Sequence, residues 1–461
     1  MKTTKWIFLL ILLFSAAMKA EAQDMDDNTL KISGNLLSDE RFLLKSPNSW
    51  AWNETRLTLN LDKKVSGSSL FHSEVWLRNI GLPKMVTSSD LYNKGIIDPY
   101  NLEIREAYFQ VNGFLLKNLD LKVGRQYISW GTADKLNPTS NLNPYDMEDI
   151  LDFGRHRGSD AIRLDFYLNN DFSLQGVYVP FFQPANLPVG MFSEALNSQV
   201  TLPAGLVLKG SSGTLLTPGY NLKESSTAGF KFKGFLAGVD FSLSYIYGID
   251  GLPLSTLNTI IPDDASGGVN INSELSFVRS HIFGADLATS IGGMGFWAEG
   301  ALFLPTEDVY MTTDLSALYP LSPVPVTMDS LVLDSSRPYL KFIVGADYFL
   351  PDGSYFNLQY MHGFIHERGR ESMNDYFFAQ FYKKFFSEKL KIAPLGGGFI
   401  VSDWKDVKNN YALVYMPEIA LQASENAEIS VSAVLFGGKG ENLFAGLKDY
   451  NMLTLKMKYS F

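Results

Sequence analysis

Apolar and polar residues alternate one by one along much of this chain, and turn residues separate the alternating runs. In residues 235–245, the odd positions are aromatic or aliphatic, whereas Gly238, Asp240, Ser242 and Ser244 take the even positions. Successive side chains of a strand point to opposite faces, so such a run predicts a strand with one apolar face. Turn residues between the runs predict hairpins. Similar runs occupy residues 162–167, 340–348, 356–360, 427–435 and 453–461.

The length of the runs favours a membrane barrel over a soluble sandwich. Many approach or exceed the roughly 9–11 residues that cross a membrane at a tilt, whereas soluble strands average about 5–6. An unpaired sheet edge cannot lie in lipid, so a membrane sheet must close on itself. We therefore expect an all-β fold, a transmembrane antiparallel up-and-down β-barrel of about 16 strands, within a range of roughly 14–18.

Two long apolar segments interrupted by Pro and Gly lie between the predicted strands, at residues 181–225 and 305–336. Exposed apolar loops of this size need a structural or functional reason. We expect them to fold into the lumen, to form a lid, or to contact lipid outside the barrel. A barrel with inward or lid-forming loops is thus the predicted architecture.

The first residues have the pattern of a secretory signal peptide. Lys2 and Lys5 precede an apolar run from Trp6 to Phe14, and Ala20-Glu21-Ala22 gives a small-x-small cleavage pattern. The alternative is an uncleaved anchor, but the run is shorter than the roughly 20 residues of a spanning helix. We expect residues 1–22 to be removed and residues 23–461 to form a single outer-membrane barrel domain.

The last residues form an alternating run that ends on an aromatic residue. Tyr459 and Phe461 share their parity with Leu453, Leu455 and Met457, and polar residues lie between them. This ending resembles the assembly signal that the barrel-assembly machinery of Gram-negative bacteria reads in a last strand. The alternative is an ordinary edge strand. We expect an outer-membrane location, with lipid around the barrel.

Composition narrows the partners and the chemistry. The chain has 461 residues, 46% of them hydrophobic, and no cysteine, which excludes a disulfide scaffold and thiol chemistry. A net charge of −10 disfavours a nucleic-acid partner, which requires a clustered basic surface. We expect no cofactor.

A polar, proline-interrupted stretch follows the predicted strand around Gly124. We expect residues 131–150 to leave the barrel wall and to form a constriction or plug in the lumen, held by Arg125 on Asp134 or Asp146. Asn and Asp side chains can cap such turns, and Arg and Gln supply donors. The alternative is a structurally required loop that hydrogen-bonds to itself. The candidate lumen residues are Arg125, Gln126, Trp130, Asp134, Asn143, Asp146 and Arg163.

The same region resembles a known family. "REAYFQVN" (105–112) precedes "VGRQYISWG" (123–131), "NPYD" (143–146) and "VYVPFFQPANLP" (177–188). This order is similar to the Gram-negative outer-membrane family called domain of unknown function 1302, with its R-E-A-Y, G-R-Q, W-G and N-P-x-D elements. A second Asn-Pro at residues 137–138 fits the last element less well. The resemblance implies an envelope barrel with a transport role, beside exporters of lipids or hydrophobic compounds.

An enzyme is the less favoured class. His362 and His366 lie four residues apart, but on a strand they would be about 13 Å apart, too far for one metal. His72-Ser73-Glu74 supplies the residue types of a hydrolase, yet neighbouring strand residues face opposite ways. We therefore expect neither a catalytic residue nor a metal site.

The function expected from the sequence is transport. The predicted inward positions mix both signs of charge, and residues 181–225 are apolar, which favours a small, amphiphilic or hydrophobic solute. A partner exporter in the inner membrane would fit this role. The alternatives are a plugged structural or adhesive barrel and, after it, an outer-membrane hydrolase.

Overall fold

One large antiparallel sheet closes on itself to form a barrel in this computed structural model. The structure describes residues 29–45, 49–81, 85–190, 192–193, 206–263 and 267–461, so the expected signal peptide lies outside the described residues. In this described part, 19 strands belong to the sheet. The sheet closes because β1 (Lys31–Leu43) pairs with β2 (Trp50–Ser66) on one side and with β24 (Met452–Ser460) on the other.

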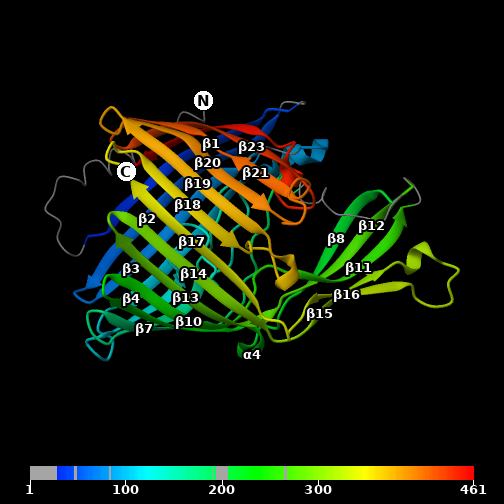
Figure 1. Cartoon of the computed structure of the whole chain (residues 1–461), viewed down its shortest axis with the longest axis horizontal. Coiled ribbons are helices and arrows are strands. Elements are labelled where there is room, and N and C mark those ends of the chain that lie inside the picture. The colour runs from blue at the N-terminus through cyan, green and yellow to red at the C-terminus, as the bar shows by residue number, and fades with distance from the viewer. Residues whose placement is uncertain (1–28, 46–48, 82–84, 191, 194–205, 264–266) are drawn as a thin grey trace.

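The remaining barrel strands follow one another around the wall in chain order (Figure 1). They are β3 (Ser69–Ile80), β4 (Tyr100–Val111), β5 (Leu119–Gln126), β6 (Ser159–Tyr167), β7 (Phe172–Val179), β9 (Thr227–Leu236), β10 (Val239–Ile249), β13 (Arg279–Ile291), β14 (Met294–Pro305), β17 (Tyr339–Phe349), β18 (Tyr355–His362), β19 (Asp375–Phe385), β20 (Leu390–Val401), β21 (Tyr411–Tyr415), β22 (Glu418–Ser424) and β23 (Ala427–Lys439).

The barrel has 18 strand positions in its described part, because β21 and β22 share one of them. Both pair with β20 on one side and with β23 on the other. The break between them falls at Met416 and Pro417, and a proline has no N–H to donate to a ladder. The predicted fold class is confirmed, and the count is 18 rather than about 16.

The two ends of the barrel differ in their connections. At one end the strands are joined by short turns. Two of them are Ala237–Gly238 and Gly292–Gly293, and these four residues have positive φ. A two-residue hairpin needs this backbone, and glycine adopts it without steric cost. The opposite end carries the long segments, and the C-terminus lies at the short-turn end (Figure 1).

The two faces of the wall differ in polarity. On β24, Leu453 and Met457 are 45% and 46% exposed, whereas Met452 and Thr454 are 0% and 4% exposed. The apolar side chains therefore cover the outside, as the alternation predicted, and an apolar outer band is the mark of a membrane-spanning barrel. Polar side chains such as Asp39, Arg41 and Glu299 lie buried on the inside.

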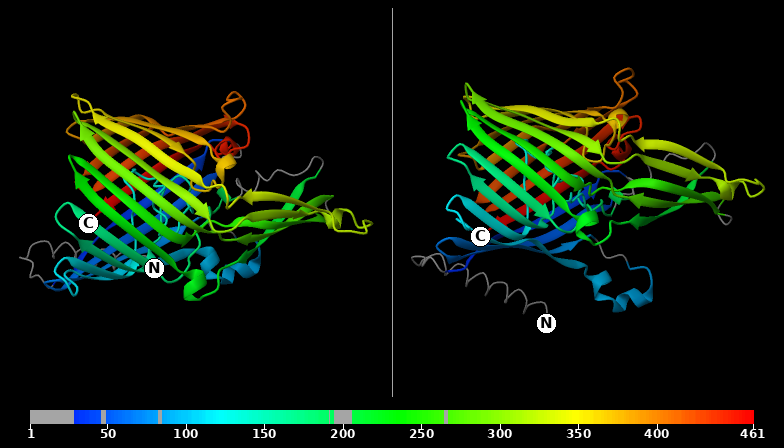
Figure 2. Two further views of the ribbon diagram at one scale, coloured as in Figure 1. Left: turned by 60° about the horizontal axis from the view of Figure 1, so that its bottom comes forward. Right: turned by 90° about the horizontal axis from the view of Figure 1, so that it is seen from below.

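Three of the long segments build a second sheet outside the barrel. Its order is β16 (Thr327–Leu333), β15 (Val309–Asp314), β11 (Leu254–Asp263), β12 (Gly268–Ser276) and β8 (Leu208–Leu216). The sheet projects away from the long-segment end of the barrel (Figures 1 and 2). Of the three placements expected for residues 181–225 and 305–336, the lumen and the lid do not apply to β8, β15 and β16. Pairing with β12 and β11 holds β8 and β15 outside the barrel, and β16 pairs with β15.

In the part of the chain that the structure describes, helices are few and short. They are η2 (Ser88–Tyr92), α2 (Lys94–Ile97), α4 (Leu222–Ser225), η3 (Ser316–Leu318), η4 (Arg370–Ser372) and η5 (Ala445–Leu447). Among the described residues, no helix is long and apolar enough to cross a membrane.

Candidate functional site: a lumenal segment between β5 and β6

Residues 127–158, here called the lumenal segment, leave the wall after β5 and return to it at β6. Half of its residues are buried and most of the others are partly buried, and the segment contains no strand of its own. Its side chains and backbone bond to inward-facing residues on β1, β3, β4, β14 and β18. The segment therefore lies inside the barrel and contacts opposite parts of the wall.

Asn143 ties the two ends of the segment together. Its Oδ1 accepts from the Ile128 N–H at 2.8 Å, and its Nδ2 donates to the carbonyls of Gln126 at 3.1 Å and Arg157 at 3.0 Å. Gln126 is fully buried and donates to the Ala161 carbonyl at 3.0 Å. These two predicted residues therefore fix the point where the segment leaves the wall.

A single carboxylate on β14 holds the next part of the segment. Glu299 accepts from the backbone N–H groups of Thr132 at 2.9 Å, Ala133 at 3.2 Å and Thr139 at 2.9 Å. It also accepts from Asn137 Nδ2 at 3.0 Å and Thr139 Oγ1 at 2.8 Å. Any side chain at Gly131 would collide with this carboxylate, since a Cβ there would lie 2.2 Å from an oxygen.

The Trp130 ring packs the lumenal segment against β9. Trp130 is 1% exposed, and its ring occupies space that a Cβ at Gly229 would fill. Its Nε1 donates to Gln175 Oε1 at 2.6 Å, and Gln175 Nε2 donates to Asp165, which pairs with Arg163 at 2.8 Å. The structure thus connects the predicted residues Trp130 and Arg163 through this chain of bonds.

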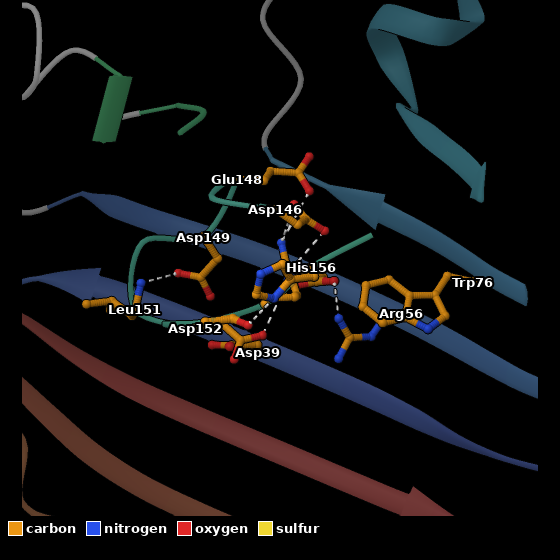
Figure 3. Close-up of polar contacts among 12 residues, drawn as sticks. Asp39, Arg56, Trp76, Asp146, Glu148, Asp149, Leu151, Asp152 and His156 are labelled. Carbon is orange, nitrogen blue, oxygen red and sulfur yellow. Dashed lines mark hydrogen bonds and ion pairs between the residues drawn. The ribbon is translucent and has the colours of Figure 1, made fainter. Parts of the chain in front are cut away.

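The acidic half of the segment faces a basic wall on β1–β4. Figure 3 shows Asp146, Glu148, Asp149 and Asp152 of the segment together with Arg56 and Trp76 of that wall. Asp149 forms a bidentate ion pair with Arg41, whose two terminal nitrogens donate to the two carboxylate oxygens at 2.8 and 2.5 Å. Glu148 pairs with Arg78, and Asp146 pairs with Arg105 at 2.7 Å. Burial by itself would raise the pKa of Asp146, but the nearby Arg155 and Arg105 outweigh it and lower the pKa to about 2.

Stacking on one indole holds the basic wall in place. The guanidinium groups of Arg56 and Arg105 lie 4.1 and 4.2 Å from the Trp76 ring centre. Arg78 and Arg155 approach the same ring at 5.7 and 5.8 Å. Cation–π attraction strengthens when water is excluded, so the indole and the carboxylates together hold these positive charges close to one another.

The opposite part of the wall is apolar on its inner face. A buried cluster there includes Trp297, Ile343, Met361, Tyr376, Ile400 and Val414. Ala133, Leu136 and Ile150 of the lumenal segment belong to the same cluster. The segment therefore lies between a charged wall and a wall that carries this apolar cluster beside the polar residues Glu299, Asn357 and Gln359.

The expected role of Arg125 is wrong. It shares its parity with Val123, which is exposed on the outer face, and it pairs with Asp160 at 3.0 Å. Asp146 is held by Arg105 and Arg155 instead, and Asp134 accepts from Asn357 and Gln359 at 3.1 Å each. The alternation of β5 explains the result, because Arg125 lies one residue away from the inward-facing Gln126.

Sequence reasoning missed Glu299 and the four wall arginines Arg41, Arg56, Arg78 and Arg105. The available signal was a charged residue inside an otherwise apolar strand, as in "FWAEGALF" at 296–303. A charge at such a position needs a partner, because burying it unpaired is costly. Its partner lies 160 residues away in the chain, at Thr139, so only the folded barrel identifies it.

Two small cavities line the lumenal segment. One of about 50 Å³ includes Asn141, Tyr145 and Phe182, and one of about 30 Å³ includes Leu136, Lys341 and Arg368. Asn141, Tyr145, Asp250 and Phe303 line both. In the described part of the chain, no group of three or more His, Cys, Asp or Glu residues is placed to hold a metal ion.

The family model described as Protein of unknown function (DUF1302) matches residues 54–368. The chain belongs to this family. The match covers the lumenal segment together with the walls that hold it on β2–β4, β14 and β18. It confirms the resemblance seen in the sequence, and it states no function. The curated proteins include no match to the chain.

Solved barrels resemble the chain in fold at low identity. The Salmonella typhi OmpF complex with daunomycin is 10% identical, with a TM-score of 0.41, covering 95% of this chain and 99% of that one. OmpT of Vibrio cholerae is 10% identical, with a TM-score of 0.41, covering 96% and 100%. A mutant of the Rh. blastica porin is 12% identical, with a TM-score of 0.39, covering 94% and 100%.

Proposed function

We propose that this protein is an outer-membrane transport barrel whose lumen is narrowed by residues 127–158. The observation that carries the proposal is the placement of that segment across the inside of the barrel, bonded to Glu299 on one side and to Arg41, Arg78 and Arg105 on the other. A segment needed only to stabilise the wall could bond to one side. Bonds to opposite walls set the width of a passage.

The solute class we propose is a small amphiphilic or hydrophobic molecule. The basic wall on β1–β4 is already paired with the acidic residues of the segment, so it presents little free charge to an ion. The wall around Trp297, Ile343 and Val414 is apolar instead, and the lumenal segment covers it in this structure. Binding sites for such solutes are mostly apolar, with a few polar groups that orient the ligand.

The location and the partners follow from the same proposal. The barrel would lie in the outer membrane of a Gram-negative bacterium after cleavage of the signal peptide, with lipid around its apolar face. Its last strand, with Tyr459 and Phe461, would be read by the barrel-assembly machinery. An inner-membrane exporter would supply or receive the solute, and the proposal assigns the barrel no chemical reaction, cofactor or nucleic-acid partner.

A plugged structural barrel is the second candidate function. The observation in its favour is the small size of the two cavities beside the lumenal segment, about 50 and 30 Å³. A few waters fill such volumes, whereas small-molecule sites measure about 300–1,000 Å³. Transport therefore requires the segment to move, and a structural barrel would not.

Two deletions of equal length separate these candidates. One variant lacks residues 132–149 of the lumenal segment, and the matched control lacks residues 312–329 of the projecting β15–β16 hairpin. Each barrel is refolded in a planar bilayer, and its single-channel conductance is measured. We expect conductance to rise only when residues 132–149 are removed. Equal conductance in all three barrels would overturn the constriction, and silence in all three would favour the structural barrel.

A further inference from the structure

A cavity of about 760 Å³ is a depression on the outer, lipid-facing side of the wall. It extends over β13, β14 and β17–β21, on the side of the barrel that faces the viewer in Figure 1. Its rim consists of outward-facing side chains that are 37–48% exposed. They are Leu287, Val344, Leu358, Phe377, Leu395, Phe399 and Leu413.

The floor of the depression is thin because small residues form it. Ala298, Ala346 and Ala379 point outward, and Gly345 and Gly396–Gly398 leave the backbone uncovered. On the lumenal side, the Trp297 ring lies across Gly345, where a Cβ would approach it within 2.4 Å. The Phe378 ring covers Gly398 in the same way, within 2.7 Å. Little more than backbone and two rings separates the bilayer from the lumen here.

The ladder of the sheet is interrupted beside this floor. On β20, register with the neighbouring strand is lost between Ala393, which pairs with Glu418, and Gly397, which pairs with Tyr415. Pro394 and Pro417 lie in the gap on facing strands, and neither has an N–H to donate. Across this gap, the Met416 N–H donates to the Gly396 carbonyl at 2.7 Å, and the Tyr415 hydroxyl donates to the Pro394 carbonyl at 2.7 Å.

The lumenal side of the gap is apolar as well. Val414 belongs to the buried cluster that includes Trp297, Ile343 and Tyr376, and Met416 packs against that cluster. The hydroxyls of Tyr360 and Tyr415, which line the depression, are both bonded elsewhere, to Asp375 and to the Pro394 carbonyl. An apolar surface therefore continues from the bilayer, across the interrupted part of the ladder, to the apolar cluster of the lumen.

We propose that this depression binds the hydrocarbon chain of a single-chain amphiphile and that the gap between β20 and β21–β22 is the portal through which the chain passes between bilayer and lumen. The depression opens to lipid, and its outward side chains are apolar apart from two tyrosine hydroxyls that are bonded elsewhere, so a hydrocarbon chain from the membrane is the occupant that fits it. Its volume falls in the range of about 300–1,000 Å³ that small-molecule sites occupy. The portal rests on the proposed transport function and supplies its route and ligand class.

The ligand site is tested with a palmitate that carries a photoreactive diazirine on its chain. The intact barrel in phosphatidylcholine vesicles is irradiated, and labelled peptides are identified by mass spectrometry. We expect labelling to concentrate between Phe377 and Tyr415, and A379F, which fills the depression, to reduce it at least fivefold. The control A228F places the same ring on the outer face of β9 and should leave labelling unchanged. Uniform labelling around the barrel would overturn the site, and so would a change of oligomeric state in A379F, which would indicate a second barrel as the occupant.

The portal is tested with a disulfide across the gap, since the chain has no cysteine of its own. A393C/E418C joins register partners beside the gap, and S173C/K233C joins register partners on an uninterrupted ladder. Partners across an antiparallel ladder are close enough for a disulfide. We expect transfer of a fluorescent palmitate analogue between vesicle populations and the barrel lumen to fall at least tenfold in oxidised A393C/E418C and to recover on reduction. The S173C/K233C control should transfer normally in both states.

The outcomes distinguish the portal from the transport function itself. Normal transfer by oxidised A393C/E418C would overturn the portal and leave a lumenal transporter. Absence of transfer by the unmodified barrel would overturn the transport proposal and the portal with it.

Discussion

The Glu299 carboxylate of β14 accepts two hydrogen bonds from Thr139, one from its backbone N–H at 2.9 Å and one from its hydroxyl at 2.8 Å. These two residues are 160 positions apart in the chain, and their contact joins the lumenal segment to the far wall of the barrel. Three further donors of the lumenal segment bond to the same carboxylate, so Glu299 alone accepts five hydrogen bonds that attach the segment to β14.

Replacing this carboxylate should release the segment without opening the wall. We expect E299A to speed hydrogen–deuterium exchange in peptides covering residues 131–140 and to cost about 1–3 kcal/mol of unfolding free energy, because several buried donors lose their acceptor. Exchange is measured by mass spectrometry on the refolded barrel. E428Q, which alters an exposed carboxylate on β23, is the control. Equal exchange in E299A and wild type would contradict the attachment.

Arg41 should matter more to stability than Asp149, although the two form a pair. Arg41 is 1% exposed and lies between Asp39 at 2.8 Å and Asp149 at 2.5 Å. R41L leaves two buried carboxylates without that cation and should cost about 3–5 kcal/mol. D149N leaves Arg41 paired with Asp39 and should cost roughly 1–3 kcal/mol. Urea unfolding in detergent measures both, and the reverse order would contradict the structure.

His156 should make the lumenal segment sensitive to acid. Its ring packs 4.3 Å from Tyr145, and burial lowers its pKa to about 4. The pKa of a histidine in the unfolded chain is about 6.5. As far as it depends on His156, the free energy of unfolding is therefore highest above pH 6.5 and decreases as the pH falls towards 4. At pH 5 the loss should be about 2 kcal/mol. Asp146, whose pKa is about 2, stays ionised throughout this window.

The measurement for His156 is the urea unfolding free energy at pH 7 and pH 5. H156F keeps an aromatic ring and removes the titration, so its stability should change less between the two pH values than that of the wild type. The same pH dependence in both proteins would assign the effect to another group.

Arg105 and Arg125 each pair with one aspartate, but Arg105 lies on the inner face of the wall and Arg125 on the outer face, so their substitutions can be compared directly. Arg105 is buried and binds Asp146 at 2.7 Å, whereas Arg125 is partly exposed and binds Asp160 on the outer face. We expect R105Q to alter single-channel conductance and to speed exchange in residues 141–150, because Asp146 loses a cation. R125Q should leave both unchanged. An effect of R125Q equal to that of R105Q would show that the outward placement of Arg125 is wrong.

The alternating pattern was sufficient to predict the barrel, its antiparallel strands and its apolar outer face. Period-2 alternation has that power because strand geometry converts odd and even positions directly into outside and inside. The strand count was less certain from sequence, since the prolines and glycines at 393–398 and 416–417 interrupt the alternation of two strands. Pairing on both sides restores β21 and β22 to one position.

The prolines and polar side chains of residues 131–150 were enough to predict that this stretch cannot continue a strand and must satisfy its polar groups elsewhere. The sequence also indicated Asn143, Asp146 and Trp130, because Asn-Pro, Asp and Trp-Gly are locally distinctive. The tertiary structure alone decided their partners. Glu299 and Arg41 become neighbours of the lumenal segment only when 18 strand positions close. Likewise, Pro394 meets Pro417 only across the ladder of β20. Local sequence fixes which side a residue faces, but barrel closure fixes what it faces.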